Sequence, residues 1–319
     1  MLGLLHDLPV ANREEAVAPF IERISRISSE ELQYLAADVH KQSGVICQSA
    51  ASFRETKHAK ANSHVSLFEI HDYPSSKQGP TWWSNGTTQD SSSRPLAGLK
   101  VVDMSRIIAA PAVSRGLAEL GASVMRVTSP HLPDMHVLHI DLNWGKWSCS
   151  VDLKTDTGKQ ALRDLIWEAD VVVQGYRPHS LEKYGFGPQD ILRMTKDREG
   201  GIVVLRENCY GWYGPWSDRA GWQQISDSCV GISHGFGKAM GHTDGESVTA
   251  IFSNSDYMCG VSGVCATLLA LMRRGEHGGS YLVDVALNYY NQWLVDCVGE
   301  YPEHVWQSLW ERHGKQIFR

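Results

Sequence analysis

Short apolar runs alternate with segments of helical character between residues 99 and 287, and no other feature constrains the fold as strongly. Apolar runs of about four to eight residues bounded by polar residues are typical of buried strands. Strands that alternate with helices along a chain assemble into a mainly parallel sheet with crossover helices. The pattern predicts strands at residues 99–104, 124–127, 170–173, 201–205 and 281–287, with helices at 109–120, 158–168 and 260–274.

A different pattern precedes the first of these strands. Residues 14–39 carry apolar side chains at helical spacing, with an interruption near Ser28. A serine followed by acidic residues suits the start of a second helix, because its hydroxyl caps the first turn and carboxylates favour the positive end of the helix dipole. Residues 73–94 are rich in Ser, Gly, Thr and Pro, which predicts a linker. We expect an α/β protein with a Rossmann-like, mainly parallel sheet and flanking helices, preceded by an N-terminal helical segment.

Length and charge exclude several classes of protein. The 319 residues, 42% of them hydrophobic, suffice for one large domain or two ordinary ones. The net charge of −6 supplies no basic field for nucleic acid or an anionic membrane, so a phosphate-bearing ligand would need a local basic patch. No apolar run approaches the ~20 residues of a membrane span, and the first residues lack the features of a secretory signal. We expect a cytoplasmic protein with no nucleic-acid or membrane partner.

The seven cysteines are scattered along the chain, with no CxxC pair. An odd, unpatterned number in a chain of this length is typical of reduced thiols in an intracellular protein. Zinc sites need closely spaced ligand pairs, so we expect no metal site.

Short motifs follow one another in a defined order between residues 95 and 287. They are PLAGLKVVDMSR (95–106), LAELGASV (117–124), SVDLK (150–154), ADVVVQGYRP (169–178), LEKYGFG (181–187), YGWYGPW (210–216), DYMCG (256–260) and VDVAL (283–287). Each motif alone is weakly specific, but their shared order and spacing are highly specific. Together they resemble the family III (CaiB/BaiF-type) CoA-transferases. The resemblance implies acyl-CoA and a carboxylic acid as substrates, with no permanently bound cofactor.

The resemblance also implies where CoA binds. Lysine and arginine can pair with its phosphates, and tyrosine can pack on its adenine or pantetheine arm. The alternative for each basic residue is an ordinary solvated surface charge. The matching positions are Arg106, Ile107, Ile108 and Ala109 after the first strand, Lys154 after the SVDLK motif, and the pairs Gly175-Tyr176 and Lys183-Tyr184.

The family's nucleophile is an aspartate just before a glycine-containing apolar helix, and Asp256, followed by Gly260, matches that placement. A carboxylate can attack the thioester carbonyl and expel the CoA thiolate, which gives an aspartyl anhydride. A thiol has a pKa near ~8.5, so its thiolate is a tolerable leaving group. Backbone N–H groups beside Asp256 could hold the developing oxyanion, and Gly260 would allow close approach. The alternative is that Asp256 simply caps the helix.

The chain departs from the family pattern at several positions. Ser129 replaces an arginine after the second strand, Trp144 and Trp147 replace two more, and Gly175 replaces the asparagine of an Asn-Phe pair. The order of segments resembles part of a tandem-repeat member: residues 1–72 resemble the tail of a first repeat, 73–94 an inter-repeat linker, and 95–319 a CoA-transferase domain truncated at its C-terminal end. The resemblance implies a homodimer.

Competing functions remain open at this stage. Related racemases use a histidine–aspartate pair, but Trp222 stands at the histidine position and indole cannot accept a proton. A CoA-ester lyase or a non-catalytic CoA-binding scaffold stays possible. A Rossmann dehydrogenase is disfavoured because no GxGxxG motif follows a strand.

Overall fold

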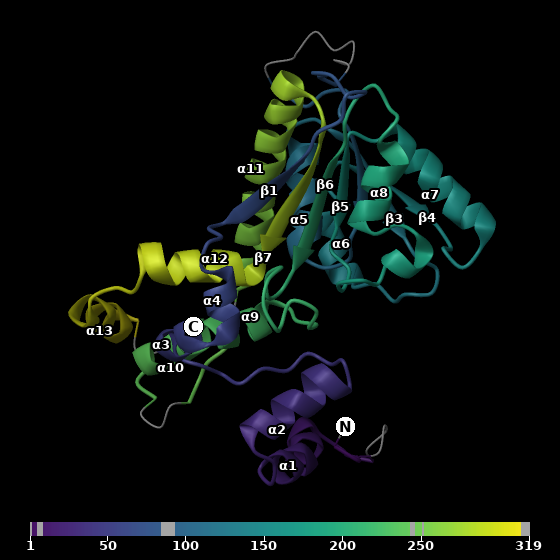
Figure 1. The fold of residues 1–319 in the computed structure, drawn as a ribbon. Coiled ribbons are helices and arrows are strands. Elements are labelled where there is room, and N and C mark those ends of the chain that lie inside the picture. Colours follow the sequence, from purple (N-terminus) through teal and green to yellow (C-terminus); the bar gives the residue numbers. More distant parts are fainter. Residues whose placement is uncertain (1, 5–8, 84–92, 243–245, 251, 314–319) are drawn as a thin grey trace.

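The chain is built around one seven-stranded sheet (Figure 1). The computed structural model describes residues 2–4, 9–83, 93–242, 246–250 and 252–313. The strands lie in the order β1-β7-β6-β5-β2-β3-β4, all parallel except β1, which pairs antiparallel with β7. The prediction of a mainly parallel sheet with flanking helices is therefore confirmed. The strands are β1 (Phe68–Tyr73), β2 (Lys100–Met104), β3 (Ser123–Thr128), β4 (Lys146–Ser150), β5 (Val171–Gln174), β6 (Val203–Asn208) and β7 (Ser280–Ala286).

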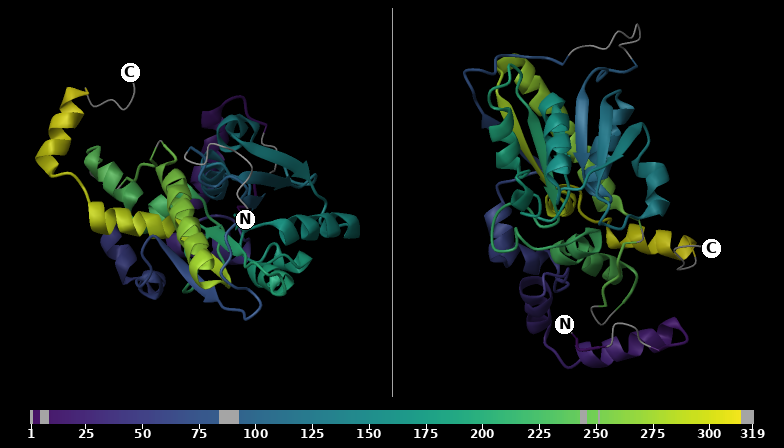
Figure 2. Two further views of the ribbon diagram at one scale, coloured as in Figure 1. Left: turned by 90° about the horizontal axis from the view of Figure 1, so that it is seen from above. Right: turned by 90° about the vertical axis from the view of Figure 1, so that its right-hand side faces the viewer.

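The helices fall into a covering set on the sheet and a second group at one end of it (Figures 1 and 2). The N-terminal and central ones are α1 (Arg13–Ile24), α2 (Ser29–Gln33), the π-helix η1 (Tyr34–Val39), α3 (Ala50–Glu55), α4 (Lys57–Asn62), α5 (Ala109–Glu119), η2 (His136–Leu138), α6 (His139–Leu142), α7 (Asp156–Glu168), η3 (Glu182–Tyr184) and α8 (Pro188–Thr195). The remaining ones are α9 (Gln223–Val230), α10 (Ile232–Ala239), α11 (Asn254–His277), α12 (Leu287–Trp293), the π-helix η4 (Leu294–Val298) and α13 (Glu303–Arg312).

Alternate residues of the parallel strands face two separate cores. Val171 and Val173 of β5 pack in the core beneath α5 and α11, whereas Val172 packs beneath α7 and α8. Such strands are buried on both faces, which explains why they read as unbroken apolar runs in the sequence. The alternation from strand to helix thus predicts the layers correctly because each helix covers the strand beside it.

Two edge strands were not predicted from the sequence. β1 lies inside residues 1–72, which were expected to be helical, and pairs with β7 from Phe68–Val285 to Tyr73–Ser280. β4, with the sequence KWSCS, forms the other edge of the sheet. Both strands are largely polar because an edge strand faces solvent on one side. The expected linker at residues 73–94 begins where β1 ends, and residues 84–92 within it lie outside the described residues.

The predicted second N-terminal helix begins where expected. The Ser28 hydroxyl accepts a hydrogen bond of 3.2 Å from the Glu31 N–H at the start of α2. The apolar stripe of α1 does not join a core: Phe20 and Ile21 are 43% and 62% exposed, and none of the residues of α1 is buried.

By length and composition alone, α11 could cross a membrane, although no apolar run was expected to be long enough for a span. In the fold it is a core helix that packs along α5 and β7. Its contact with α5 is close because Gly260 and Gly263 face that helix. A Cβ on Gly260 would lie 2.6 Å from the Cβ of Ala112, and one on Gly263 would lie 2.5 Å from Cγ2 of Val113.

We expect Gly263→Val to destabilise the protein by about 1–3 kcal/mol, because the added methyl groups overpack a buried contact with Val113 and Leu205. Met272→Val places the same side chain on the exposed face of α11 and should change the free energy of unfolding by no more than about 0.5 kcal/mol. Urea unfolding of both variants makes the comparison. Equal stability would contradict the close packing of α11 on α5.

Candidate active site

The parallel strands have a topological switch point between β2 and β5. From this point the sheet grows through β3 and β4 on one side and through β6 and β7 on the other. Ligands of open α/β sheets bind at the carboxyl ends of the strands at such a point. The loop after β2 carries Arg106, Ile107 and Ile108, and Gly175 and Tyr176 follow β5. The fold therefore brings two of the predicted CoA-binding segments together.

Gly175 is required by the close approach of these two segments. A Cβ at this position would lie 2.4 Å from the Cβ of Ala110 and 3.2 Å from the Cβ of Ser105. An asparagine here would force the loop after β2 or the start of α5 to move. The departure from the family's Asn-Phe pair thus has a packing cause in this chain.

A buried ion pair supports the loop after β2. The Lys146 ammonium donates to Asp103 at 2.9 Å and to the Ser114 hydroxyl at 2.7 Å, and the Asp103 and Lys146 side chains are almost completely buried. Ser105 also donates to Asp103, which ties the first residue of the loop to the strand. Burial lowers the pKa of Lys146, and the charge of Asp103 opposes that shift. Sequence reasoning missed this role of Lys146, and the only available signal was a charged residue within an edge strand.

Arg106, in the loop after β2, forms no ion pair with the described residues. Its Nε atom is buried and has no hydrogen-bond partner among the described residues. Tyr176 beside it is partly buried, which raises the pKa of its phenol, and the charge of Arg106 acts in the opposite direction. An unpartnered guanidinium at a sheet switch point can bind an anion without first breaking an ion pair.

The other predicted CoA contacts come from two further segments. Lys154 is exposed after β4, and the ammonium of Lys183 lies 5.0 Å above the ring of Tyr184 on η3. Trp144 and Trp147, which replace two arginines of the family pattern, are 63% and 70% exposed. The structure thus gathers Arg106, Ile107, Ile108, Ala109, Gly175 and Tyr176 at the switch point, and η3 lies beside Tyr176, because Glu182 lines the same small cavity and Tyr184 packs against the same apolar core.

Asp256 is the third residue of α11 and is 7% exposed. Ser253 occupies the N-cap position, and no side chain makes a capping hydrogen bond there. The Asp256 carboxylate accepts no hydrogen bond from the described residues, which disfavours a role as a helix cap. Gly260, one turn later, would place a Cβ 3.2 Å from the backbone oxygen of Ala109, so this end of α11 lies against the predicted CoA loop. Gly260 serves helix packing, rather than the approach of substrate that the sequence had suggested.

Asp256 is one of three neighbouring carboxyl groups, of which Asp227 and Asp256 are buried and Glu207 is partly buried. Burial, with the charge of Asp227 as the second cause, raises the pKa of Asp256 to about 7. Burial and then the charge of Asp256 raise the pKa of Glu207, at the end of β6, to about 8. Sequence reasoning missed both Asp227 and Glu207. A glutamate close behind the apolar run of β6, between Arg206 and Asn208, was the available signal for Glu207.

Asp227 is held by a polar network on α9, α11 and α12. Its Oδ1 accepts from the Ser255 hydroxyl and the Asn291 amide at 2.8 and 2.9 Å, and its Oδ2 accepts from Gln223 at 3.0 Å. These bonds partly offset the desolvation that raises its pKa. Because Ser255 precedes Asp256, the network fixes the first turn of α11 and hence the position of the Asp256 carboxylate.

A second cluster lies on the β1–β7 edge. Donor atoms of Glu69, His71 and Asp284 lie within 4.8 Å of one another, a spacing that could suit a metal ion. Both oxygens of Asp284 already accept from Arg206, at 2.6 and 2.9 Å. The guanidinium of Arg206 also lies 3.7 Å from the ring centre of Trp212. The cluster is therefore an ion-pair network that joins β1, β6 and β7 rather than an open ligand set.

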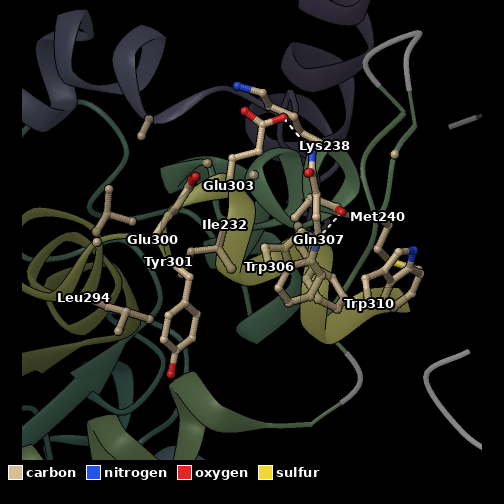
Figure 3. A pocket seen from close by; sticks show the side chains of 18 of the residues that line it. Ile232, Lys238, Met240, Leu294, Glu300, Tyr301, Glu303, Trp306, Gln307 and Trp310 are labelled. Carbon is tan, nitrogen blue, oxygen red and sulfur yellow. Dashed lines mark hydrogen bonds between the residues drawn. The ribbon is translucent and has the colours of Figure 1, made fainter. Parts of the chain in front are cut away.

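A cavity of about 1070 Å³ lies between α10, η4 and α13 (Figure 3). Its walls are mainly apolar and aromatic: Trp306 and Trp310 stack with ring centres 5.8 Å apart, and Ile232, Leu294 and Tyr301 lie around them. Asp256 does not line this cavity. A smaller cavity, of about 40 Å³, lies at the carboxyl ends of β5 and β6 and is lined by Tyr176 and Glu207.

Comparison with known proteins agrees with this geometry. The sequence model of CoA-transferase family III matches residues 96–314. The chain is 50% identical over 320 aligned residues to acetyl-coenzyme A transferase nodX of Hypoxylon pulicicidum. The chain belongs to CoA-transferase family III. The alignment with nodX covers 100% of this chain and 54% of the relative.

More distant relatives give the same family. The chain is 32% identical over 246 residues to the succinyl-CoA–L-malate CoA-transferase beta subunit of Chloroflexus aurantiacus, covering 72% of this chain and 57% of the relative. Among solved structures, a CAIB/BAIF family protein from Brucella suis aligns with a TM-score of 0.54 and 27% identity, covering 72% of this chain and 60% of that one. The chain spans about half the length of the curated relatives it matches.

We expect Asp256→Asn to stabilise the protein at pH 8–9 but not at pH 4. The pKa of Asp256 is raised in the folded protein, so the folded state binds the proton more tightly than the unfolded state and loses stability as the pH rises from about 4 through about 7. Asparagine carries no charge and avoids this loss. Thermal unfolding at the two pH values should show a gain of at least about 2 °C at high pH only. A gain of the same size at pH 4 would contradict the desolvated-carboxyl account.

Proposed function

We propose that this chain transfers coenzyme A between an acyl-CoA and a carboxylic acid, with Asp256 as the nucleophile. The observation that carries the proposal is a desolvated carboxyl group, without a hydrogen-bond partner in the described part of the chain, beside the loop after β2. A carboxylate without hydrogen bonds or a paired cation keeps its full nucleophilicity toward a carbonyl carbon. The names of relatives that act on acetyl-CoA and succinyl-CoA support small acyl groups as the first donors to test.

The reaction proceeds through mixed anhydrides. One oxygen of Asp256 attacks the thioester carbonyl, the C–S bond breaks, and the CoA thiolate leaves with the electron pair. The thiolate then attacks the carbonyl of Asp256 itself, which releases the donor acid and leaves CoA on the enzyme. The acceptor carboxylate attacks this thioester, and CoA finally attacks the acceptor's carbonyl and frees Asp256. Each step exchanges one acyl bond for another without an external oxidant or reductant.

We place the CoA-binding site at the switch point between β2 and β5. Arg106 offers an unpartnered guanidinium for a phosphate, and Tyr176 offers a partly buried ring for the adenine or pantetheine arm. Lys154 and Lys183 remain exposed and could meet the more distant phosphates of a molecule as long as CoA. No permanently bound cofactor is needed for this chemistry, and CoA enters as a substrate.

Access to Asp256 requires movement or additional protein. With the side chain 7% exposed, a thioester reaches it only when neighbouring side chains shift. The apolar stripe of α1 is exposed, and the relatives are about twice as long as this chain. The exposed stripe supports the proposal of a homodimer as the active form, and we propose the cytoplasm as its location.

Other reactions of the family fit less well. Trp222, at the position of a racemase histidine, is 53% exposed and has no basic nitrogen. A scaffold that binds CoA without reacting is the remaining alternative, because it needs only the switch-point residues.

Hydroxylamine trapping separates the enzyme from the scaffold. With acetyl-CoA or succinyl-CoA and hydroxylamine, we expect a hydroxamate on Asp256 in the wild type, detected by peptide mass spectrometry. Asp256→Asn should form none and should release CoA at least about 1000-fold more slowly, because the nucleophile is lost. Bound CoA in the wild type without a hydroxamate would favour the scaffold.

The variant Arg106→Ala tests the proposed CoA-binding site. Loss of one charge-assisted bond to phosphate should weaken CoA binding by about 1.5–3 kcal/mol, or roughly 10- to 150-fold. Arg26→Ala, which removes an exposed arginine from the N-terminal segment, is the matched control and should leave binding unchanged. Isothermal titration with free CoA measures both. Equal affinity of the two variants would exclude Arg106 from the phosphate site.

A further inference from the structure

Glu207 stands where the proposed nucleophile meets the CoA loop, yet the anhydride chemistry gives it no role. It follows the apolar part of β6 and lines the small cavity at the carboxyl ends of β5 and β6 together with Tyr176. Its Oε2 would lie 3.6 Å from a Cβ on Gly175, the residue that packs against Ser105 and Ala110, which flank the predicted CoA segment. Glu207 therefore borders the same space as the loop after β2.

No cation neutralises Glu207. It takes part in none of the hydrogen bonds or ion pairs among the described residues, whereas Arg206, its neighbour in sequence, is committed to Asp284. An unpaired carboxylate in a desolvated place is costly, so such a group keeps its proton. With Asp256 close by, the two carboxyl groups cannot both ionise cheaply, and the proton resides on Glu207 while Asp256 acts as the nucleophile.

Other titratable or charged groups also lie around Glu207. Cys209 and Cys259 flank it and Asp256, and both thiols have pKa values raised by burial, so they stay neutral. The charge of Asp227 acts on Asp256, and the charge of Asp256 acts on Glu207. The cavity that Glu207 lines is completed by Tyr176, Arg177, His179, Glu182 and Arg206.

We propose that Glu207 is the general acid that protonates the CoA sulfur as Asp256 takes the acyl group, and the base that recovers this proton when CoA attacks again. In the first step the Asp256 oxygen–carbon bond forms, the C–S bond breaks, and the Glu207 O–H proton moves to sulfur. In the return step the thiol proton moves back to Glu207 while sulfur attacks the anhydride carbonyl. The proton count is unchanged over a full cycle. This inference rests on the proposed function of Asp256.

Glu207→Gln keeps the size of the side chain but removes the acidic proton. With acetyl-CoA as the probe, we expect the burst of free CoA at pH 7 to slow about 100-fold, the low end for general acid catalysis because a thiolate leaves readily. In the wild type the burst rate should rise with pH through about 7, as Asp256 ionises, and fall through about 8, as Glu207 loses its proton. The variant should lose the fall at high pH and keep the rise.

Glu168→Gln is the matched control, because Glu168 is exposed and pairs only with Lys100 at the far end of the sheet. It should leave the burst and its pH profile unchanged. If Glu207→Gln fails to fold, the solvent deuterium isotope effect on the wild-type burst is measured instead. We expect a value of about 2 or more, because a proton is transferred in the transition state.

A burst within about twofold of the wild type, with the high-pH fall retained, overturns the role of Glu207, as does an isotope effect of one. These results are separable from failure of the proposed function. An Asp256 hydroxamate that still forms with an unchanged Glu207→Gln profile removes only Glu207, whereas a wild type without any hydroxamate removes the anhydride chemistry itself.

Discussion

The close packing of α11 on α5 determines where every other part of the site lies. Glycines at positions 260 and 263 let the two helices approach until a single methyl group would collide with Ala112 or Val113. That contact places the first turn of α11 against the loop after β2, at the switch point of the sheet. The Asp103–Lys146 pair beneath the loop and the Asp227 network beneath the helix then fix the two sides independently.

The site concentrates carboxyl groups where water is scarce. Asp227, Asp256 and Glu207 each have a pKa raised by burial, and each ionisation makes the next more difficult. This arrangement lowers the stability of the folded chain at high pH. In return it holds the Asp256 carboxylate free of hydrogen bonds from the described residues and favours the protonated form of Glu207, which is the pair of states that the proposed acyl transfer uses.

Much of the fold is readable from the sequence, because buried parallel strands appear as apolar runs and their crossover helices follow them. The strands at the two edges, β1 and β4, are not readable in this way, since their residues are partly buried or exposed and polar and charged side chains interrupt any apolar run. Asp256 and the loop after β2 were predicted from the motif order. Lys146, Asp227 and Glu207 were not, because their roles depend on contacts between residues 28 to 64 positions apart in the chain, or on burial that no local pattern encodes.

The central claim is that the Asp256 carboxyl group forms covalent mixed anhydrides with the donor and acceptor acids. Turnover with an acceptor acid labelled with ¹⁸O in both carboxylate oxygens tests it directly, because the bridging oxygen of the second anhydride comes from the acceptor and stays on the enzyme when CoA departs with the acyl group. After a single turnover the account predicts one ¹⁸O atom in the peptide that contains Asp256, and none in the same peptide when the acyl-CoA donor is omitted. Transfer of CoA to the acceptor without label in that peptide would contradict a covalent role for Asp256.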